Sequence, residues 1–203
     1  METQNVLTHT PPPAWRAVAV WSATVAVFLA GVALVAALGL DLDAISRDSN
    51  ETTDAPVETG ALARVGFILW GGAAATAGLV ALIAGDAGTR RMFGVLALGL
   101  AGLALDDALL IHEVVLPELG VPEKLVLAIW ALAAGFWLVR YAPRIHRANW
   151  TLGVLALGAF AGSLAIDVLG HTEWAEDVLK TVGIGTLVAV LAAELRATVE
   201  ARR

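Results

Sequence analysis

Long apolar stretches separated by short charged segments dominate the chain. Residues 17–40 contain no charged side chain at all, and five later stretches are nearly as apolar. About 20 apolar residues in a helix cross a bilayer core, and these stretches lack the alternation of a membrane β-barrel. The pattern therefore predicts an all-α, polytopic bundle of six transmembrane helices. The predicted spans are 17–40, 65–85, 92–113, 123–141, 149–169 and 176–196.

Composition supports a membrane protein and removes several function classes. The 203 residues are 58% hydrophobic and 16% charged, outside the range of soluble domains. The absence of cysteine excludes disulfides, thiolate nucleophiles and cysteine-ligated iron–sulfur clusters. The net charge of -6 and the lack of a large basic patch argue against nucleic acid as a partner. Membrane lipids are the expected partners, with another membrane protein or a second copy of the chain left open.

One membrane domain is expected between two short tails. Residues 1–14 are polar and contain three prolines, which predicts a disordered cytoplasmic tail. The uncharged stretch that follows is too long for a signal peptide, so it is expected to be a retained span. The transmembrane domain then covers 15–198, and 199–203 form a second cytoplasmic tail.

Arginines predict the orientation of the spans. Arg90 and Arg91 lie between the second and third spans, four basic side chains lie in 140–147, and three arginines lie in 196–203. Positive residues favour the cytoplasmic side, which six spans with both termini inside satisfy at every loop. The acidic loops are then expected on the outer side of the cell inner (plasma) membrane.

A short motif occurs twice. The hexapeptide Gly-Val-Leu-Ala-Leu-Gly stands at 94–99 and again at 153–158. Leu-Ala-Leu-Asp or Leu-Ala-Ile-Asp follows each copy, and a histidine and a glutamate come later. The shared order suggests a duplicated two-helix unit. Chance recurrence in sequence rich in Ala, Leu and Gly is the alternative.

Helix length places some charges inside the bilayer boundary. Only 14 residues separate Arg91 from Asp106, and these reach about 21 Å. The helix is therefore expected to continue to about Glu113, which puts Asp106 and Asp107 below the hydrocarbon boundary. Ionisable groups at such depth cost several kcal/mol unless they are paired or face a wet cavity, so they should point into the bundle.

In that continuous helix, Asp106 and Glu113 are seven residues apart and share a face. His112 lies one step round, and Asp107 is expected to point elsewhere.

A second group of polar residues follows about sixty positions later. Ser163, Asp167 and His171 are spaced by four and form one stripe if the fifth helix extends that far. Glu176 and Lys180 are expected to form an i,i+4 pair in the next helix. We expect the two groups to face each other across the bundle, within about one helix diameter, ~10 Å.

Two histidines and several carboxylates on neighbouring helices suit a divalent metal, with zinc favoured. A catalytic metal would hold a water, with Glu113 or Glu173 as base. The candidate ligands are Asp106, His112, Glu113, Asp167 and His171.

Other interpretations stay open. One alternative is a purely structural polar cluster neutralised by Lys180, and another is a haem with His112 and His171 as axial ligands. A cation pathway would need polar groups in the other half of each span, which is nearly bare of them.

The stretch from Leu105 to Glu113, with Pro117 and Glu118 after it, resembles a family of uncharacterised bacterial multi-pass membrane proteins. These carry Asp-(Asp/Glu), four spacers and His-Glu at the outer end of a span. More distantly, the chain is similar to the superfamily of membrane metal hydrolases that includes alkaline ceramidases and progestin/adipoQ receptors. That resemblance implies zinc, a lipid-like substrate and a catalytic role for Ser163, beside Asp167 and His171. Six spans and the lack of a His-x-x-x-His pair depart from it.

The sequence thus predicts a membrane-embedded, metal-dependent hydrolase acting on a lipid-like substrate. A non-enzymatic membrane subunit or scaffold is the alternative.

Overall fold

The computed structural model describes residues 33, 37, 61–145, 150–169 and 173–202, and this part of the chain is helical without strands. The predicted first span, 17–40, and the first tail lie outside the described residues, apart from two helical positions. The elements are α3 (Ala61–Ile83), α4 (Ala87–Ala108), the π-helical η1 (Ile111–Val115), α5 (Leu116–Glu118), α6 (Glu123–Ile145), α7 (Trp150–Leu169) and α8 (Glu173–Glu200).

Three described helices are long and apolar enough to cross a membrane: Leu62–Ile83, Glu123–Arg144 and Trp174–Glu200. A fourth crossing is possible if α4 and the bent segment Ile111–Glu118 count as one span. The apolar part of α7, Thr151–Asp167, is shorter. The all-helical class is therefore confirmed for the described residues, while the number of six spans stays a prediction.

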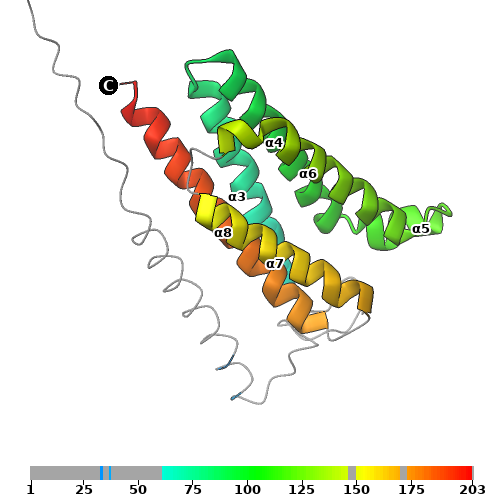
Figure 1. The fold of residues 1–203 in the computed structure, drawn as a ribbon. Helices are drawn as coiled ribbons and strands as arrows, with labels where there is room; N and C mark the ends of the chain where they lie inside the picture. Colours follow the sequence, from blue (N-terminus) through cyan, green and yellow to red (C-terminus); the bar gives the residue numbers. More distant parts are fainter. Residues whose placement is uncertain (1–32, 34–36, 38–60, 146–149, 170–172, 203) are drawn as a thin grey trace, which may run out of the picture.

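The helix α3 lies at the centre of the packing (Figure 1). It packs against α4 on one side and α8 on the other, and α7 packs against α8. Its buried side chains recur every three or four residues, at Trp70, Ala73, Ala77, Val80 and Ala84. Small residues in this stripe allow the neighbouring helices to approach closely.

The helix α6 lies beside α4 (Figure 1). Side chains of α6 reach across to α4. The indole of Trp137 donates a hydrogen bond to the backbone oxygen of Met92 in α4 (3.1 Å), and Tyr141 is buried. The opposite face exposes Leu132, Phe136 and Val139. Exposed apolar side chains of this kind suit contact with lipid.

The turn between α3 and α4 is closed by a helix cap. The Asp86 carboxylate accepts a hydrogen bond from the backbone N–H of Thr89 (2.9 Å). Hydrogen bonds from Thr89 hold the pKa of Asp86 below its ordinary value, and the charge of Arg144 adds to this. Gly88 leaves room for the Arg144 guanidinium of α6, which lies directly over it. We call this the arginine end of the bundle, since Arg90 and Arg91 follow the turn.

The expected continuous helix from 92 to 113 is broken. Helix α4 ends at Ala108, and Leu110 adopts a left-handed conformation with φ 50°. The backbone N–H of Val115 then bonds to the oxygen of Leu110, five residues earlier, and the axis bends by 63°. A left-handed leucine costs about 1–2 kcal/mol, so other contacts must stabilise this bend. Those contacts lie at the candidate site.

Candidate functional site

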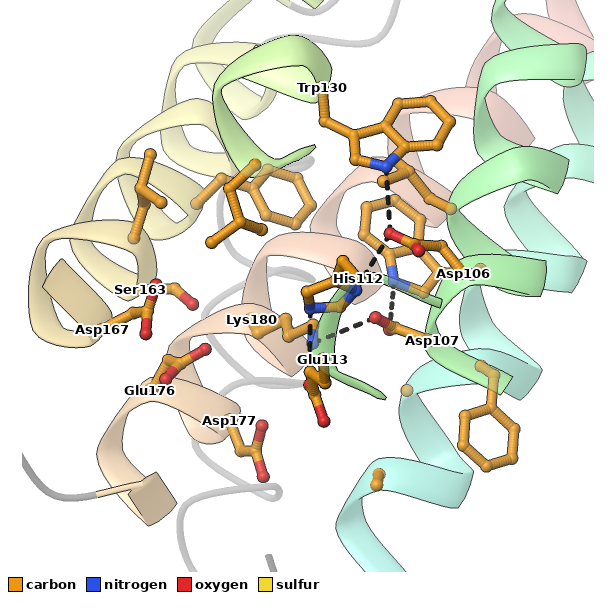
Figure 2. A pocket seen from close by; sticks show the side chains of 18 of the residues that line it. Asp106, Asp107, His112, Glu113, Trp130, Ser163, Asp167, Glu176, Asp177 and Lys180 are labelled. Carbon is orange, nitrogen blue, oxygen red and sulfur yellow. Dashed lines mark hydrogen bonds and ion pairs between the residues drawn. The ribbon is translucent and has the colours of Figure 1, made fainter. Parts of the chain in front are cut away.

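A pocket of about 520 Å³ lies at the end of the bundle opposite the arginine end. Its walls come from the first residues of α3, α6 and α8 and from the last turns of α4 and α7, together with η1. Five antiparallel helices therefore bring this end of each element together. Figure 2 shows polar side chains from α4, η1, α7 and α8 around the pocket.

Asp107 is bonded to two neighbouring helices. Its Oδ2 accepts a hydrogen bond from the indole of Trp70 in α3 (2.9 Å), and its Oδ1 lies 3.2 Å from Nζ of Lys180 in α8. Asp107 points toward α3 and α8, while Asp106 contacts α6, yet both side chains line the same pocket. Lys180 forms its ion pair with Asp107, where the sequence predicted Glu176.

Asp106 is the more deeply buried carboxylate, with 4% of its surface exposed. Its Oδ2 accepts a hydrogen bond from the indole of Trp130 in α6 (2.9 Å). The same oxygen lies 3.0 Å from Nδ1 of His112. That close contact lacks hydrogen-bond alignment, and Nδ1 is a buried nitrogen without a hydrogen-bond partner. The Nε2 atom of His112 lies 3.4 Å from Glu113.

The break after α4 creates this arrangement. In a continuous helix His112 would lie away from the face that carries Asp106. The left-handed Leu110 and the π-helical turn fold His112 back over the end of α4, where it is buried. Contacts with two carboxylates therefore help to offset the cost of the bend.

Two tryptophans donate hydrogen bonds to the aspartates of α4, and a glycine makes room for one of the indole rings. A Cβ atom on Gly102 would lie 2.7 Å from Cη2 of Trp130, so only glycine fits beneath that indole. Trp70 also stacks on Phe160 of α7 at 5.4 Å between ring centroids. Tryptophan near the end of a span is usually part of an interfacial aromatic belt, so these two do not stand out in the sequence. The signal that could have found them is the need of each buried aspartate for a donor.

The facing wall of the pocket comes from α7 and α8. Ser163, Asp167, Glu176 and Asp177 line it, and Ser163 is buried (Figure 2). Within the described residues, no lysine, arginine or histidine forms an ion pair with Asp167 or Glu176.

The predicted site residues thus have different outcomes. Asp106, His112, Glu113, Ser163 and Asp167 all line the same pocket, while their roles as ligands or catalytic groups stay predictions. His171 lies outside the described residues, and Glu173 begins α8 with a side chain that is not described. Among the described residues, no three histidine or carboxylate side chains converge as metal ligands do.

A family model described as Domain of unknown function (DUF8692) matches residues 13–193 of the chain. The match includes every helix that lines the pocket. No curated protein and no solved structure matches the chain.

Proposed function

The chain belongs to the DUF8692 family, and we propose that it is an integral membrane protein that binds a positively charged ligand in the pocket at one end of its bundle. The membrane assignment is supported by three or four described helices of spanning length. The remaining argument comes from the charges that line the pocket.

An excess of carboxylates carries the proposal. Seven acidic side chains line the pocket, against one lysine and one histidine. Burying a carboxylate without a partner costs several kcal/mol, and the cost is higher beside a membrane core. Lys180 and His112 contact three of the seven, and no described cation forms an ion pair with Asp167 or Glu176, which favours a cation from outside beside these two. The acids are Asp106, Asp107, Glu113, Glu123, Asp167, Glu176 and Asp177.

A divalent metal, with zinc first, is the cation that the sequence predicts. The 3.0 Å contact between Asp106 and His112 favours it, because it brings two atoms that ligate metals close together. Two ligand atoms about 2.1 Å from a tetrahedral zinc lie about 3.4 Å apart, so this pair would open slightly around the ion. The orphaned Nδ1 of His112 would then be a ligand and Asp106 its neighbour. A bound metal would supply an activated water for hydrolysis of a lipid-like substrate. Glu113, Glu173 and Ser163 remain the proposed catalytic residues.

A non-enzymatic subunit is the second candidate. The observation that favours it is the bonding of Asp106 and Asp107 to Trp130 and Trp70, which satisfies these acids within the protein. Haem held by His112 and His171 is the least supported proposal, since carboxylates suit hard cations better.

We also propose the topology that the arginines favour. Six spans with both termini in the cytoplasm would place the arginine end inside and the pocket on the outer side of the inner membrane. The pocket lies opposite the end that carries Arg90, Arg91 and Arg144, which supports this orientation, although Arg64 lies at the pocket end.

Equilibrium dialysis of the purified protein against zinc, manganese and methylammonium tests the proposed function. We expect saturable binding of at least one cation by the wild type, and a loss of about tenfold or more in affinity for Asp167→Asn/Glu176→Gln. Glu194→Gln is the matched control, because Glu194 lies on α8 outside the pocket. The proposal fails if no cation binds, or if both variants bind as the wild type does.

A further inference from the structure

The two walls of the pocket differ in how their charges are paired. On the first wall, Asp106 and Asp107 accept hydrogen bonds from tryptophans and contact His112 and Lys180. The hydrogen-bond donors on this wall, which are two indoles and the Lys180 ammonium, are already bonded to these aspartates. Asp106 and Asp107 therefore have less acceptor capacity left for a ligand than the acids of the facing wall.

On the second wall, two carboxylates have no cation beside them. Asp167 of α7 and Glu176 of α8 lie on helices that pack together, and neither is paired with a described cation. Lys180, one turn beyond Glu176, is bonded to Asp107. Ser163 is 6% exposed, lines the pocket, and forms no hydrogen bond through its side chain with another described residue. A hydroxyl without a hydrogen-bond partner, on a residue that is 6% exposed and beside two carboxylates without a cation, points to a ligand that donates hydrogen bonds.

The size and lining of the pocket suit an organic cation better than a single metal ion. A volume of about 520 Å³ is typical of sites for small organic molecules. No three described acids or histidines converge around one point, as the ligands of a metal do. Apolar side chains from four helices complete the lining, among them Leu62, Phe67, Leu103, Leu127 and Leu164.

We infer that the ligand is an amphiphilic organic ammonium compound, with its nitrogen between Asp167 and Glu176 and its apolar portion along the leucines of the pocket. The inference rests on the proposed function and names the class of cation. The ammonium group donates hydrogen bonds to both carboxylates and to the Ser163 hydroxyl. The stacked rings of Trp70 and Phe160 add an aromatic surface to the lining of the pocket.

Tryptophan fluorescence of the full chain in a non-ionic detergent measures this binding, because Trp70 and Trp130 line the pocket. The probes are dodecylamine, its neutral match dodecanol, and the short butylamine. We expect a saturable change with dodecylamine and an affinity at least about tenfold weaker for butylamine and for dodecanol. Equal affinities for dodecylamine and dodecanol would overturn the ammonium, and equal affinities for both amines would overturn the apolar portion.

Two variants locate the site. Asp167→Asn/Glu176→Gln should weaken dodecylamine binding about tenfold or more, while Glu194→Gln leaves it unchanged. Ser163→Leu, which keeps every carboxylate but fills the space beside them, should weaken binding similarly. Wild-type affinity in both pocket variants would overturn the inference.

Measuring the binding of metal ions as well as dodecylamine distinguishes the ammonium ligand from the broader proposal of a cation pocket. Saturable binding of zinc or manganese without binding of dodecylamine would overturn the ammonium ligand and leave the cation pocket standing. Binding of neither class would overturn both.

Discussion

At the scale of single residues, two neighbouring aspartates show how the membrane helices tolerate buried charge. Asp106 and Asp107 diverge from α4, and each accepts a hydrogen bond from a tryptophan on a different helix. An indole is a donor with a large apolar body, so it satisfies a carboxylate without adding a second charge. The pair therefore connects α4 with both of its neighbours.

Trp130→Phe tests the value of one such bond. The phenyl ring keeps the packing against α4 but leaves Asp106 without its 2.9 Å donor. We expect a loss of about 1–3 kcal/mol in the free energy of unfolding in detergent. Trp137→Phe is the control, because its indole bonds to a neutral backbone oxygen, and the loss should be smaller. Equal losses would contradict a special role for Asp106.

The charged members of the site were predictable from the sequence, and their partners were not. Asp106, His112 and Asp167 stand out because charge is rare in apolar stretches. Trp70 and Trp130 do not stand out, since tryptophan near a span end is ordinary. The pairing of Lys180 with Asp107 depends on the packing of α3, α4 and α8, which spacing within one helix does not contain.

At the scale of elements, the break after α4 shapes the site. The apolar pattern placed the described helices within a few residues, although α8 extends from Glu173 to Glu200, beyond the expected 176–196. It did not predict the break, because Leu109 and Leu110 carry no glycine or proline signal. Tertiary contacts of His112 with the acids favour the bend over a continued helix.

Gly102→Ala tests the close approach of α4 and α6. The added Cβ would lie 2.7 Å from the Trp130 ring and push it from Asp106. We expect a destabilisation of about 1–3 kcal/mol, measured by unfolding in detergent. Gly99→Ala is the control, because no atom lies within 4 Å of its Cβ. That variant should be neutral or more stable by about 0.5–1 kcal/mol, and a matching loss in both would refute the packing argument.

The cap of α4 predicts a pH effect at the arginine end. Hydrogen bonds from Thr89 lower the folded-state pKa of Asp86 below 3.8, its unfolded value. Its contribution to stability is thus full above pH 3.8 and is lost as the pH falls through the folded pKa. Asp86→Asn keeps the cap without the titration. The unfolding midpoint of the wild type should fall more steeply than that of the variant below pH 3.8; parallel curves would contradict this.

At the scale of the whole molecule, alternating helix directions gather one end of each described helix at the pocket. Arg90, Arg91 and Arg144 lie at the other end, whereas Arg64 lies in the first turn of α3, at the pocket end. The sequence predicted this separation because loop charge and span length are local properties. The number of spans stays a prediction, since 17–40 lies outside the described residues.

Cysteine labelling in intact cells tests the orientation, and the chain offers a clean background because it contains no cysteine. Glu118→Cys lies near the pocket end and Arg91→Cys at the arginine end, both at exposed positions. A membrane-impermeant maleimide should label the first variant from outside and the second only after lysis. The reverse result would contradict termini in the cytoplasm.

The stability of the ligand-free protein tests the cation pocket most directly. If Asp167 and Glu176 await a cation, they repel each other when the pocket is empty, and Asp167→Asn/Glu176→Gln removes that repulsion. After exhaustive dialysis, the variant should therefore be more stable than the wild type to unfolding in detergent, by about 0.5–2 kcal/mol. A less stable variant would mean that these carboxylates already have partners within the protein, and would contradict a pocket built for a cation.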